Sequence, residues 1–518
     1  MATSIEPGRP QRPAGRGERQ SSHVRDPLLS VPLIAASTRA ALGRALLVVL
    51  LAGCAGADAQ SPATPDADLS RLALPSVGLR ARDLAVVIND SDPASVEIGR
   101  YYAAKRGIAA SRVIHVRFPR HPVMNLGDFM RVKEVLDARL GPEVQALALA
   151  WTAPFRVECM SVTAAFALGF DPASYCAEGC LTTKPSPYFN SASYAPYTDH
   201  RVRPAMLLAA GDVAGGKQLI DRGLRSDEAW PEGKAYLMNT SDSGRNVRAE
   251  TYARVKEVLG SAYPIEQVDA DALEGKSDIM FEFTGVARVA AMTSNRFLDG
   301  AIADHLTSWG GGLIGYDQTT AVDWLAAGAT GSYGTSSEPC NFRGKFPEVG
   351  VVMAHYLAGE TLVEAYWKSV LMPGQGVFVG DPLARPFGGV RVSRSAAGTV
   401  ISTRALAPGN YLLEAGRSSV GPFKPIRTVQ VVGFGMRQLT LPAADPRYFR
   451  LREIAPPARP TSATSPESAD GPAPRAAADG AGPQRSLASA TGGAARKRCI
   501  ASTATISVRP IASAMPPG

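Results

Sequence analysis

One histidine and one cysteine of this sequence could together carry out a reaction. His305 lies in "FLDGAIADHLTSWGGGLIGYD", residues 297–317, and Cys340 follows in "GTSSEPCNF". A histidine beside a cysteine favours the thiolate form, and the thiolate is the nucleophile of cysteine hydrolases. The two residues would therefore support a hydrolase if the fold brings their side chains within hydrogen-bond distance.

The residues around His305 favour a structural role over this catalytic one. Apolar residues recur at helical spacing from Ile302 to Trp309, so residues 296–309 are predicted to form an amphipathic helix that ends at three glycines. On such a helix, His305 packs against its neighbours and bonds to a nearby carbonyl. A cysteine hydrolase that uses His305 and Cys340 remains the alternative.

Four cysteines of the central region could form two disulfides. An even number of cysteines in an exported protein favours disulfides, and three pairings are possible. A zinc site is the sharper alternative, but "CAEGC" supplies only one close pair of ligands, and free thiols also remain open. We expect Cys176 to bond to Cys180 and Cys159 to lie near Cys340, which would remove Cys340 as a nucleophile.

The N-terminal segment predicts export. "STRAALGRALLVVLLAGCAGADAQ" has two arginines and then an apolar run that is too short to span a bilayer but has the length of a signal-peptide core. Leu51-Ala52-Gly53-Cys54 resembles a bacterial lipobox, in which Cys54 carries the lipid. Cleavage a few residues later is the alternative. We expect a periplasmic or outer-membrane lipoprotein that meets the membrane only through this lipid.

The net charge does not indicate nucleic-acid binding. The formal charge is +8, and much of the excess lies in the two ends of the chain, for example in "RPQRPAGRGERQ" and "GGAARKRC". A surface that follows a phosphate backbone needs Lys and Arg clustered on the folded part. The middle of the sequence mixes charges of both signs, so nucleic acid is not an expected partner.

The elements that must position these residues alternate between strands and helices. "LAVVIN", "RVIHVRF" and "VQALALAW" are predicted strands, separated by helices over 91–107 and 126–140. This alternation is typical of a doubly wound, mostly parallel α/β sheet. It continues through "DIMFEFTG", "GGLIGYD" and "ATGSYGTSSEP" as three more strands, with a helix over 319–327.

We divide the 518 residues into five segments from these patterns. Alternation with period two between Gly-rich turns predicts a small antiparallel β-sandwich after the α/β domain, and a Pro/Ala/Ser/Gly-rich tail is predicted to be disordered. The segments are a leader at 1–54, a linker at 55–81, an α/β domain at 82–387 with an insertion at 152–203, the β-sandwich at 388–450 and the tail at 451–518.

Polar residues at the predicted strand ends form a pool of ligand-binding candidates. In open α/β sheets, ligands bind outside the carboxyl ends of the strands, although turn chemistry alone explains each residue singly. The pool consists of Asn89, Asp90, Arg245, Thr284, Tyr316, Asp317 and Glu338.

The sequence indicates neither a metal nor a cofactor. Asp317 with Asp323, and Asp199 with His200, could bind a cation, but helix capping and turns explain such residues at element ends. The glycines at 310–312 lack the G-x-G-x-x-G spacing of a dinucleotide site, and "GSYGTS" lacks the G-x-S-x-G frame of a nucleophile elbow.

Three stretches carry a resemblance to a known family. "VVINDSDPASVEIGRYYAAKRGI", "NRFLDGAIADHLTSWGGGL" and "EAYWKSVLMPGQGVFVGDPLARPF" resemble an uncharacterised family of exported bacterial proteins found in genomes that encode exosortases. The resemblance covers residues 82–387 and implies no activity. No C-terminal sorting helix is evident.

A more distant resemblance is to the gingipain-like cysteine peptidases, which have a caspase-like fold. In those peptidases, a His-Gly pair follows one core strand and the nucleophilic Cys ends the next. Here "DIMFEFTG" ends in Thr284-Gly285 and "GGLIGYD" ends in Tyr316-Asp317. The resemblance therefore implies the caspase-like fold without the peptidase dyad. The leading hypothesis is an exported, non-catalytic domain that binds a peptide, glycan or envelope partner, and a purely structural scaffold remains a third possibility.

Overall fold

The structure is a computed structural model that describes residues 72–74, 77–176, 180–395, 398–406, 408–433, 435–441 and 448–454. The leader with Cys54, the linker as far as residue 71 and the tail beyond residue 454 lie outside the described residues. Within the described ranges, no helix combines the length and the apolar character needed to cross a membrane.

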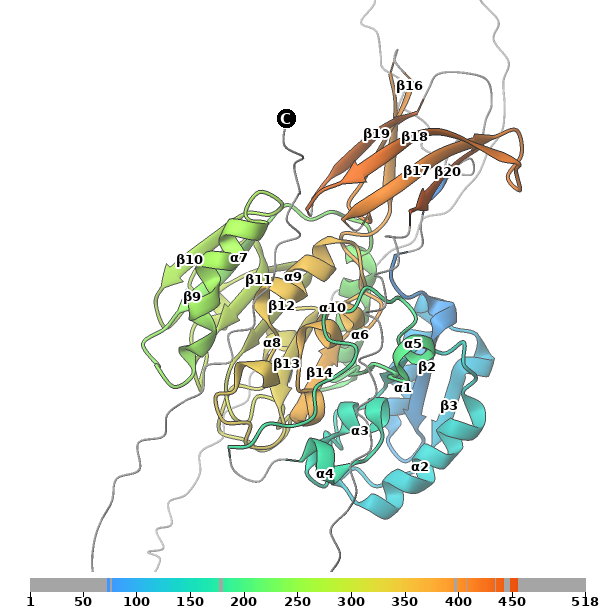
Figure 1. Cartoon of the computed structure of the whole chain (residues 1–518). Helices are drawn as coiled ribbons and strands as arrows, with labels where there is room; N and C mark the ends of the chain where they lie inside the picture. Colours follow the sequence, from blue (N-terminus) through green and yellow to red (C-terminus); the bar gives the residue numbers. More distant parts are fainter. Residues whose placement is uncertain are drawn as a thin grey trace, which may run out of the picture. The chain divides into compact units, whose positions relative to one another are not determined.

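A ten-stranded sheet forms the centre of the α/β domain (Figure 1). Most neighbouring strands run parallel, whereas β13 and β14 pair antiparallel. In order across the sheet, the strands are β10 (Ile265–Asp269), β9 (Lys234–Asn239), β11 (Ile279–Thr284), β12 (Phe297–His305), β13 (Gly331–Thr335), β14 (Gly376–Gly380), β8 (Ala205–Leu207), β5 (Ala146–Leu149), β2 (Leu84–Asn89) and β3 (Val113–Val116).

Helices cover both faces of this sheet. Asp304 and His305 are successive residues of β12, so their side chains point to opposite faces. Asp304 accepts a hydrogen bond from Tyr366 of α10, and His305 accepts one from Trp324 of α8. The helices are α1 (Pro93–Arg106), α2 (Leu126–Arg139), α3 (Val162–Leu168), α4 (Pro172–Tyr175), α5 (Pro196–His200), α6 (Val213–Ser226), α7 (Tyr252–Leu259), α8 (Ala321–Ala327), α9 (Val349–Leu357) and α10 (Leu362–Ser369).

Helix α1 begins and ends at residues whose types favour these positions. Asp92 accepts a hydrogen bond from the backbone N–H of Ala94, and Pro93 occupies the first turn, where its missing N–H has no partner to lose. Gly107 ends the helix at φ 64°, a conformation that glycine adopts without strain. The helix predicted over 91–107 is therefore confirmed, and it extends from Pro93 to Arg106.

The helix predicted at residues 296–309 is wrong, because residues 297–305 form strand β12. Residues 300–305 of this strand, "GAIADH", are buried on both faces. The apolar residues there form a run whose spacing does not distinguish a strand from a helix. The strand predicted at 311–317 is also wrong. Those residues belong to the loop that joins β12 to α8, and the strand at "GSYGT" and the helix before it are confirmed.

Two small sheets follow the α/β domain, and their strands are antiparallel, as predicted, except for the parallel pair of β1 (Leu72–Ala73) and β20 (Tyr448–Glu453). One contains β15 (Val390–Ser395), β16 (Gly398–Thr403) and β19 (Arg437–Leu441). The other contains β1, β20, β17 (Gly409–Gly416) and β18 (Phe423–Val431). Ile401, Tyr411, Leu413, Leu439 and Leu451 contribute to a shared core. Strand β1 comes from the segment expected to be a linker, and β20 runs past residue 450.

The insertion at 152–203 holds short elements together with its loops. Strands β6 (Arg156–Val157) and β7 (Met160–Ser161) join β4 (Val123–Met124) in a small three-stranded sheet. Short 3-10 helices occur at Ala81–Asp83, Ala110–Arg112, Asn246–Thr251 (η4), Met292–Ser294, Arg343–Lys345 and Pro373–Gln375.

Candidate functional site

His305 is the last residue of β12 and has no solvent-exposed surface. Its Nδ1 accepts a hydrogen bond from Trp324 Nε1 at 2.9 Å. Burial lowers the pKa of His305 to about 3, and the backbone of Thr319 offsets only part of this effect. The imidazole is therefore neutral at physiological pH and is held inside the protein by the indole of α8.

Cys340 is bonded to Cys180, and Cys159 is bonded to Cys176. Two disulfides among these four cysteines are confirmed, but the predicted pairing is wrong. Cys176 ends helix α4, and the start of α4 lies against β7, since Asp171 N–H donates to Met160 Sδ. The turn between β6 and β7 carries Cys159, so this packing brings Cys159 rather than Cys180 to Cys176.

These two observations determine whether the predicted His305–Cys340 pair exists. Cys340 Sγ is bonded to Cys180, and His305 Nδ1 is occupied by Trp324. A disulfide sulfur is not the thiolate that a cysteine hydrolase requires. The structure therefore does not form a thiol–imidazole dyad from these two residues.

Arg245 belongs to a chain of polar contacts beside the ends of β11 and β12. Its Nη1 donates to Asp242 Oδ2 at 2.9 Å, and its Nε donates to Thr307 Oγ1 at 3.2 Å. Thr307 Oγ1 donates in turn to Gln318 Oε1 at 2.9 Å, and this oxygen also accepts from the N–H of Trp309. The Arg245 side chain retains 32% of its surface exposed, so the guanidinium is held in place and still meets solvent.

The loop from 306 to 320 is fixed against β13 by close backbone contacts. Gly311 N–H donates to Thr335 O, and Thr335 Oγ1 donates to the carbonyl of Ser308. A Cβ on Gly334 would lie 2.1 Å from the backbone carbon of Gly310, so only glycine fits there. The loop is therefore held in one conformation by the strand end beneath it.

Tyr316 lies on this loop and is 36% exposed. Its ring stacks on that of Trp309 with 4.9 Å between centroids and meets Phe155 edge to face at 6.1 Å. Phe155 comes from the insertion, so the insertion and the loop after β12 meet at these rings. A partly exposed aromatic pair beside a fixed arginine is an arrangement that could bind a ligand.

Thr284 is buried, and its surroundings are structural. Its carbonyl accepts a hydrogen bond from Arg248 Nη2 at 2.8 Å, and Arg248 Nη1 pairs with Asp304 Oδ1 at 2.6 Å. Both partners of this ion pair are nearly inaccessible to solvent. Glu282, two residues earlier on β11, is also buried, and burial raises its pKa to about 8.

Asp317 and Glu338 occupy the outer part of the same region. The Asp317 side chain is 91% exposed and forms an ion pair with Arg288. Glu338 Oε1 accepts a hydrogen bond from the N–H of Cys340 at 2.8 Å, and Gln375 Nε2 donates to the carbonyl of Glu338. Glu338 thus holds the turn that carries the Cys180–Cys340 disulfide.

Asn89 and Asp90 lie apart from the other candidates. Strand β2 is six positions from β11 in the sheet, which corresponds to roughly 30 Å at about 4.8 Å per strand. Asn89 is fully buried, and both ends of its amide bond to the backbone of Phe118. Asp90 pairs with His115 at 2.6 Å. The structure does not bring these two residues to the crevice of the others.

The acidic residues considered for a cation have protein partners. Asp323 belongs to the capping box of α8 with Thr320. Asp199 accepts from Ser193 Oγ, and His200 Nε2 bonds to Ser191 Oγ at 2.9 Å. In the described part of the chain, no three His, Cys, Asp or Glu side chains gather as a metal site requires.

An open cavity of about 360 Å³ lies at the carboxyl ends of β9 and β10. None of the residues that line it was among the predicted candidates. The available signal was that Asn239 and Asp269 are polar residues that directly follow apolar ones. Between the two strand ends and the junction of η4 with α7, it is lined by Asn239, Asn246, Ala249, Glu250, Tyr252, Ala253, Gln267 and Asp269.

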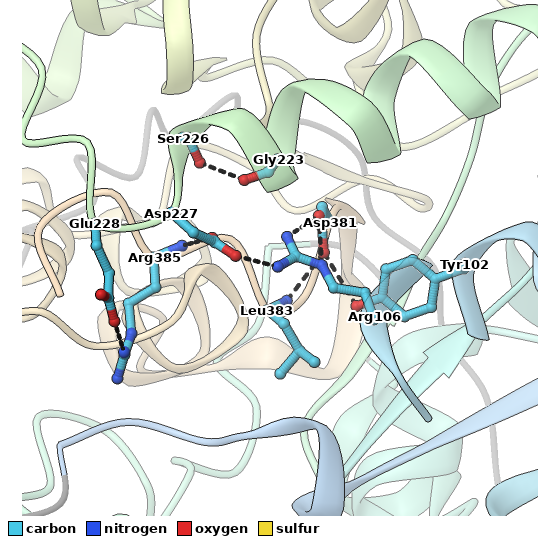
Figure 2. Close-up of polar contacts among 9 residues, drawn as sticks. All are labelled: Tyr102, Arg106, Gly223, Ser226, Asp227, Glu228, Asp381, Leu383 and Arg385. Carbon is cyan, nitrogen blue, oxygen red and sulfur yellow. Dashed lines mark hydrogen bonds and ion pairs between the residues drawn. The ribbon is translucent and has the colours of Figure 1, made fainter. Parts of the chain in front are cut away.

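A second polar cluster brings together distant parts of the chain (Figure 2). Arg106 of α1 pairs with Asp227, which follows α6, and with Asp381, which follows β14. Tyr102 OH donates to Asp381 Oδ1 at 3.0 Å, and the N–H of Arg385 donates to Asp227 Oδ1. Burial raises the pKa of Asp227 to about 6. Arg106 and Asp381 are almost completely buried, so this cluster fastens elements rather than binding a ligand.

The core strand that was predicted to follow β11 is wrong. The core strand that follows β11 is β12, which ends at His305, and not the predicted strand that ends at Tyr316-Asp317. The residue at the end of β12 is histidine rather than cysteine. Neither strand end carries a thiol, since β11 ends in Thr284 and β12 ends in His305.

The comparison with solved structures finds matches at low sequence identity and low TM-score. The complex of the pro- and mature domains of Porphyromonas gingivalis RgpB is 11% identical, with 71% of this chain and 96% of that chain covered at a TM-score of 0.33. The Arg-specific cysteine proteinase gingipain R is 11% identical, with 76% and 100% covered at 0.33. A structure described as a protease is 12% identical, with 72% and 97% covered at 0.34. No family model and no curated protein matches the sequence.

Proposed function

We propose that this chain is an exported binding protein that holds a peptide, glycan or envelope partner at the carboxyl ends of β9 to β13, and that it is not a cysteine hydrolase. The observation that carries the proposal is the state of its two best catalytic candidates. Cys340 forms a disulfide with Cys180, and the neutral, fully buried His305 bonds to Trp324.

The arrangement of the strand ends supports a binding role. Arg245 is fixed by Asp242 and Thr307 but meets solvent, and Trp309 and Tyr316 form a partly exposed stack on a loop pinned to β13. Groups that are already ordered lose little conformational entropy when a ligand binds. The surface is therefore suited to recognition without a reacting group.

A thiol-reactive peptidase probe tests the non-hydrolytic part of the proposal. We expect no labelling of the folded, non-reduced protein and no hydrolysis of peptide substrates. The same result is expected for Cys180→Ser/Cys340→Ser, which leaves no partner thiol free. Labelling at Cys340 that Cys340→Ala abolishes, together with peptide hydrolysis, would overturn the proposal and restore the cysteine-hydrolase alternative.

The export part of the proposal rests on the disulfides and the leader. Two disulfides are typical of an extracellular or periplasmic compartment. Anchoring through lipid on Cys54 stays a prediction, because Cys54 lies outside the described residues. Mass spectrometry of the mature N-terminus should find a lipidated Cys54, and an unmodified start further along the chain would contradict the anchor.

A further inference from the structure

We infer that the cavity at the ends of β9 and β10 is a subsite for a neutral saccharide. This inference rests on the proposed binding function and names the class of ligand. The cavity volume of about 360 Å³ lies at the lower end of the range of about 300–1,000 Å³ for small-molecule sites. Such a space suits one or two sugar rings better than an extended polymer.

The register of the strands explains why polar side chains line this cavity. Asn239 pairs with Asp269 and Leu237 pairs with Gln267, so Gln267, Asp269 and Asn239 share one face of the sheet. That face is the one on which η4 places Asn246 and Glu250. The lining therefore contains three primary amides and two carboxylates, which together donate and accept hydrogen bonds in several directions.

Two of the three amides, those of Asn239 and Asn246, are held in place by hydrogen bonds within the lining. Asn246 Nδ2 donates to Asn239 Oδ1 at 2.6 Å, and Asn239 Nδ2 donates to Asp269 Oδ1 at 2.7 Å. Asn246 Oδ1 also accepts from the N–H of Thr240 at 3.1 Å. Each amide retains a second N–H, and Asp269 retains its other oxygen. A pair of neighbouring sugar hydroxyls can both donate to a carboxylate and accept from an amide, which matches this set.

The charges of the lining favour a neutral ligand. Two carboxylates disfavour an anion, since like charges repel in a partly enclosed space. Neither carboxylate is fully available to a cation: Glu250 pairs with Arg343 at 2.9 Å, and Asp269 already accepts from Asn239. A ligand that bonds through hydroxyl groups needs no countercharge.

Small residues leave room for a ring. Ala249 and Ala253 lie one helical turn apart in the lining, and the ring of Tyr252 forms part of the buried base, with its OH bonded to the carbonyl of Phe283. A larger side chain at position 253 would project into the cavity. This position therefore allows the cavity to be closed without changing its polar residues.

Direct binding of soluble saccharides to the folded, non-reduced protein tests the inference. The probes are maltotriose, cellotriose and a trimer of N-acetylglucosamine, with a galacturonate trimer and a lysine tripeptide as charged comparisons, followed by NMR or calorimetry. We expect at least one neutral trimer to bind, and Asp269→Asn and Ala253→Phe to weaken it at least about tenfold, which corresponds to one charge-assisted hydrogen bond. Ala104→Phe, on the exposed surface of α1, is the matched control and should leave binding unchanged.

The outcomes separate this inference from the proposed function. If no neutral trimer binds at about 10 mM, or if only a charged probe binds, the saccharide inference fails while the non-hydrolytic proposal stands. Binding that Ala253→Phe and Asp269→Asn leave intact also overturns it, because the sugar would then occupy another surface. Labelling of Cys340 by the thiol probe together with hydrolysis of a peptide substrate would overturn the proposed function instead, whether or not a saccharide binds.

Discussion

At the scale of single residues, burial rather than sequence neighbourhood sets the chemistry of the titratable groups. Glu282 and His305 both lie on the central strands, and both are almost inaccessible to solvent. Burial disfavours the charged form of each side chain, so it raises the pKa of Glu282 to about 8 and lowers that of His305 to about 3. Both groups are uncharged at neutral pH.

Glu282→Gln should therefore stabilise the protein in a manner that depends on pH. Between pH 4.5 and 8 the unfolded state loses the Glu282 proton and the folded state keeps it, so the native protein loses stability as the pH rises. The glutamine removes this loss. We expect the free energy of unfolding to increase by roughly 2–4 kcal/mol at pH 8 and to change little near pH 5.

Urea unfolding at both pH values measures this difference. The control is Glu274→Gln, a change at an exposed residue shortly before β11. It should change the unfolding free energy little at either pH. An equal effect of Glu282→Gln at pH 5 and pH 8 would contradict the buried, protonated state.

The sequence identified several residues of the strand-end region but not their partners. Arg245, Thr284 and Tyr316 were selected because they follow predicted strands, and the structure places them at the ends of β9, β11 and β12 or in the loop beyond. The stack of Tyr316 on Trp309 and its contact with Phe155 could not be predicted, because they depend on how a loop and an insertion fold toward each other. Whether these residues bind a ligand stays a prediction.

At the scale of elements, residues around His305 show where periodicity fails. A strand buried on both faces has no alternation, and the spacing of its apolar residues fits a helix equally well. Strands such as β2 and helices such as α1 were predictable because glycine, proline and capping residues mark their ends. The end of β12 carries no such mark before the glycines at 310–312.

One prediction at this scale concerns the loop after β12. Gly334→Ala should destabilise the protein by about 1–3 kcal/mol and loosen the loop at 306–320, because the added methyl group would overlap the backbone of Gly310. Thermal unfolding and limited proteolysis within the loop measure the two effects. Gly211→Ala, where a Cβ would meet nothing within 4 Å, is the control. Equal stability of the two variants would show that the loop can move away from β13.

The two disulfides allow a second prediction about elements. The Cys180–Cys340 bond joins residues 160 apart in the sequence, and the Cys159–Cys176 bond joins residues 17 apart. The longer loop restricts the unfolded chain more, so its loss should reduce the unfolding free energy by about 5 kcal/mol, against about 3 kcal/mol for the shorter one.

Denaturant unfolding of Cys180→Ser/Cys340→Ser and Cys159→Ser/Cys176→Ser compares the two losses. Paired replacement avoids leaving a free thiol that could exchange. A larger loss for the Cys159–Cys176 pair would mean that local packing, rather than restriction of the unfolded chain, governs the effect.

At the scale of the whole molecule, two of the three stretches that carry the sequence resemblance meet the end of α6 in one ion-pair cluster. Arg106, Asp227 and Asp381 come from α1, the end of α6 and the end of β14 (Figure 2). Their spacing in the sequence gave no sign of this contact, since residues so far apart meet only through the order of the strands. The cluster links the first helix of the domain to its last central strand.

Arg106→Met should therefore weaken the whole α/β domain. It leaves the fully buried Asp381 without its countercharge, which costs about 3–5 kcal/mol. Arg100→Met, exposed on the same helix, should have little effect. Unfolding of the double variant Arg106→Met/Asp381→Asn completes the cycle and should recover part of the loss. No recovery would mean that Arg106 acts through packing alone.

The position of β14 has a consequence for the order of events during synthesis. This strand, Gly376–Gly380, is the last of the ten to be made, yet it lies between β13 and β8 and is completely buried. Until residues 376–380 have been made, β10 to β13 and β8 to β3 can pair only as two separate half-sheets, each with an unpaired inner edge. Such edges attract other strands, and pairing across long stretches of chain is slow. A chain that begins to fold before these five residues are in place therefore exposes both inner edges to aggregation.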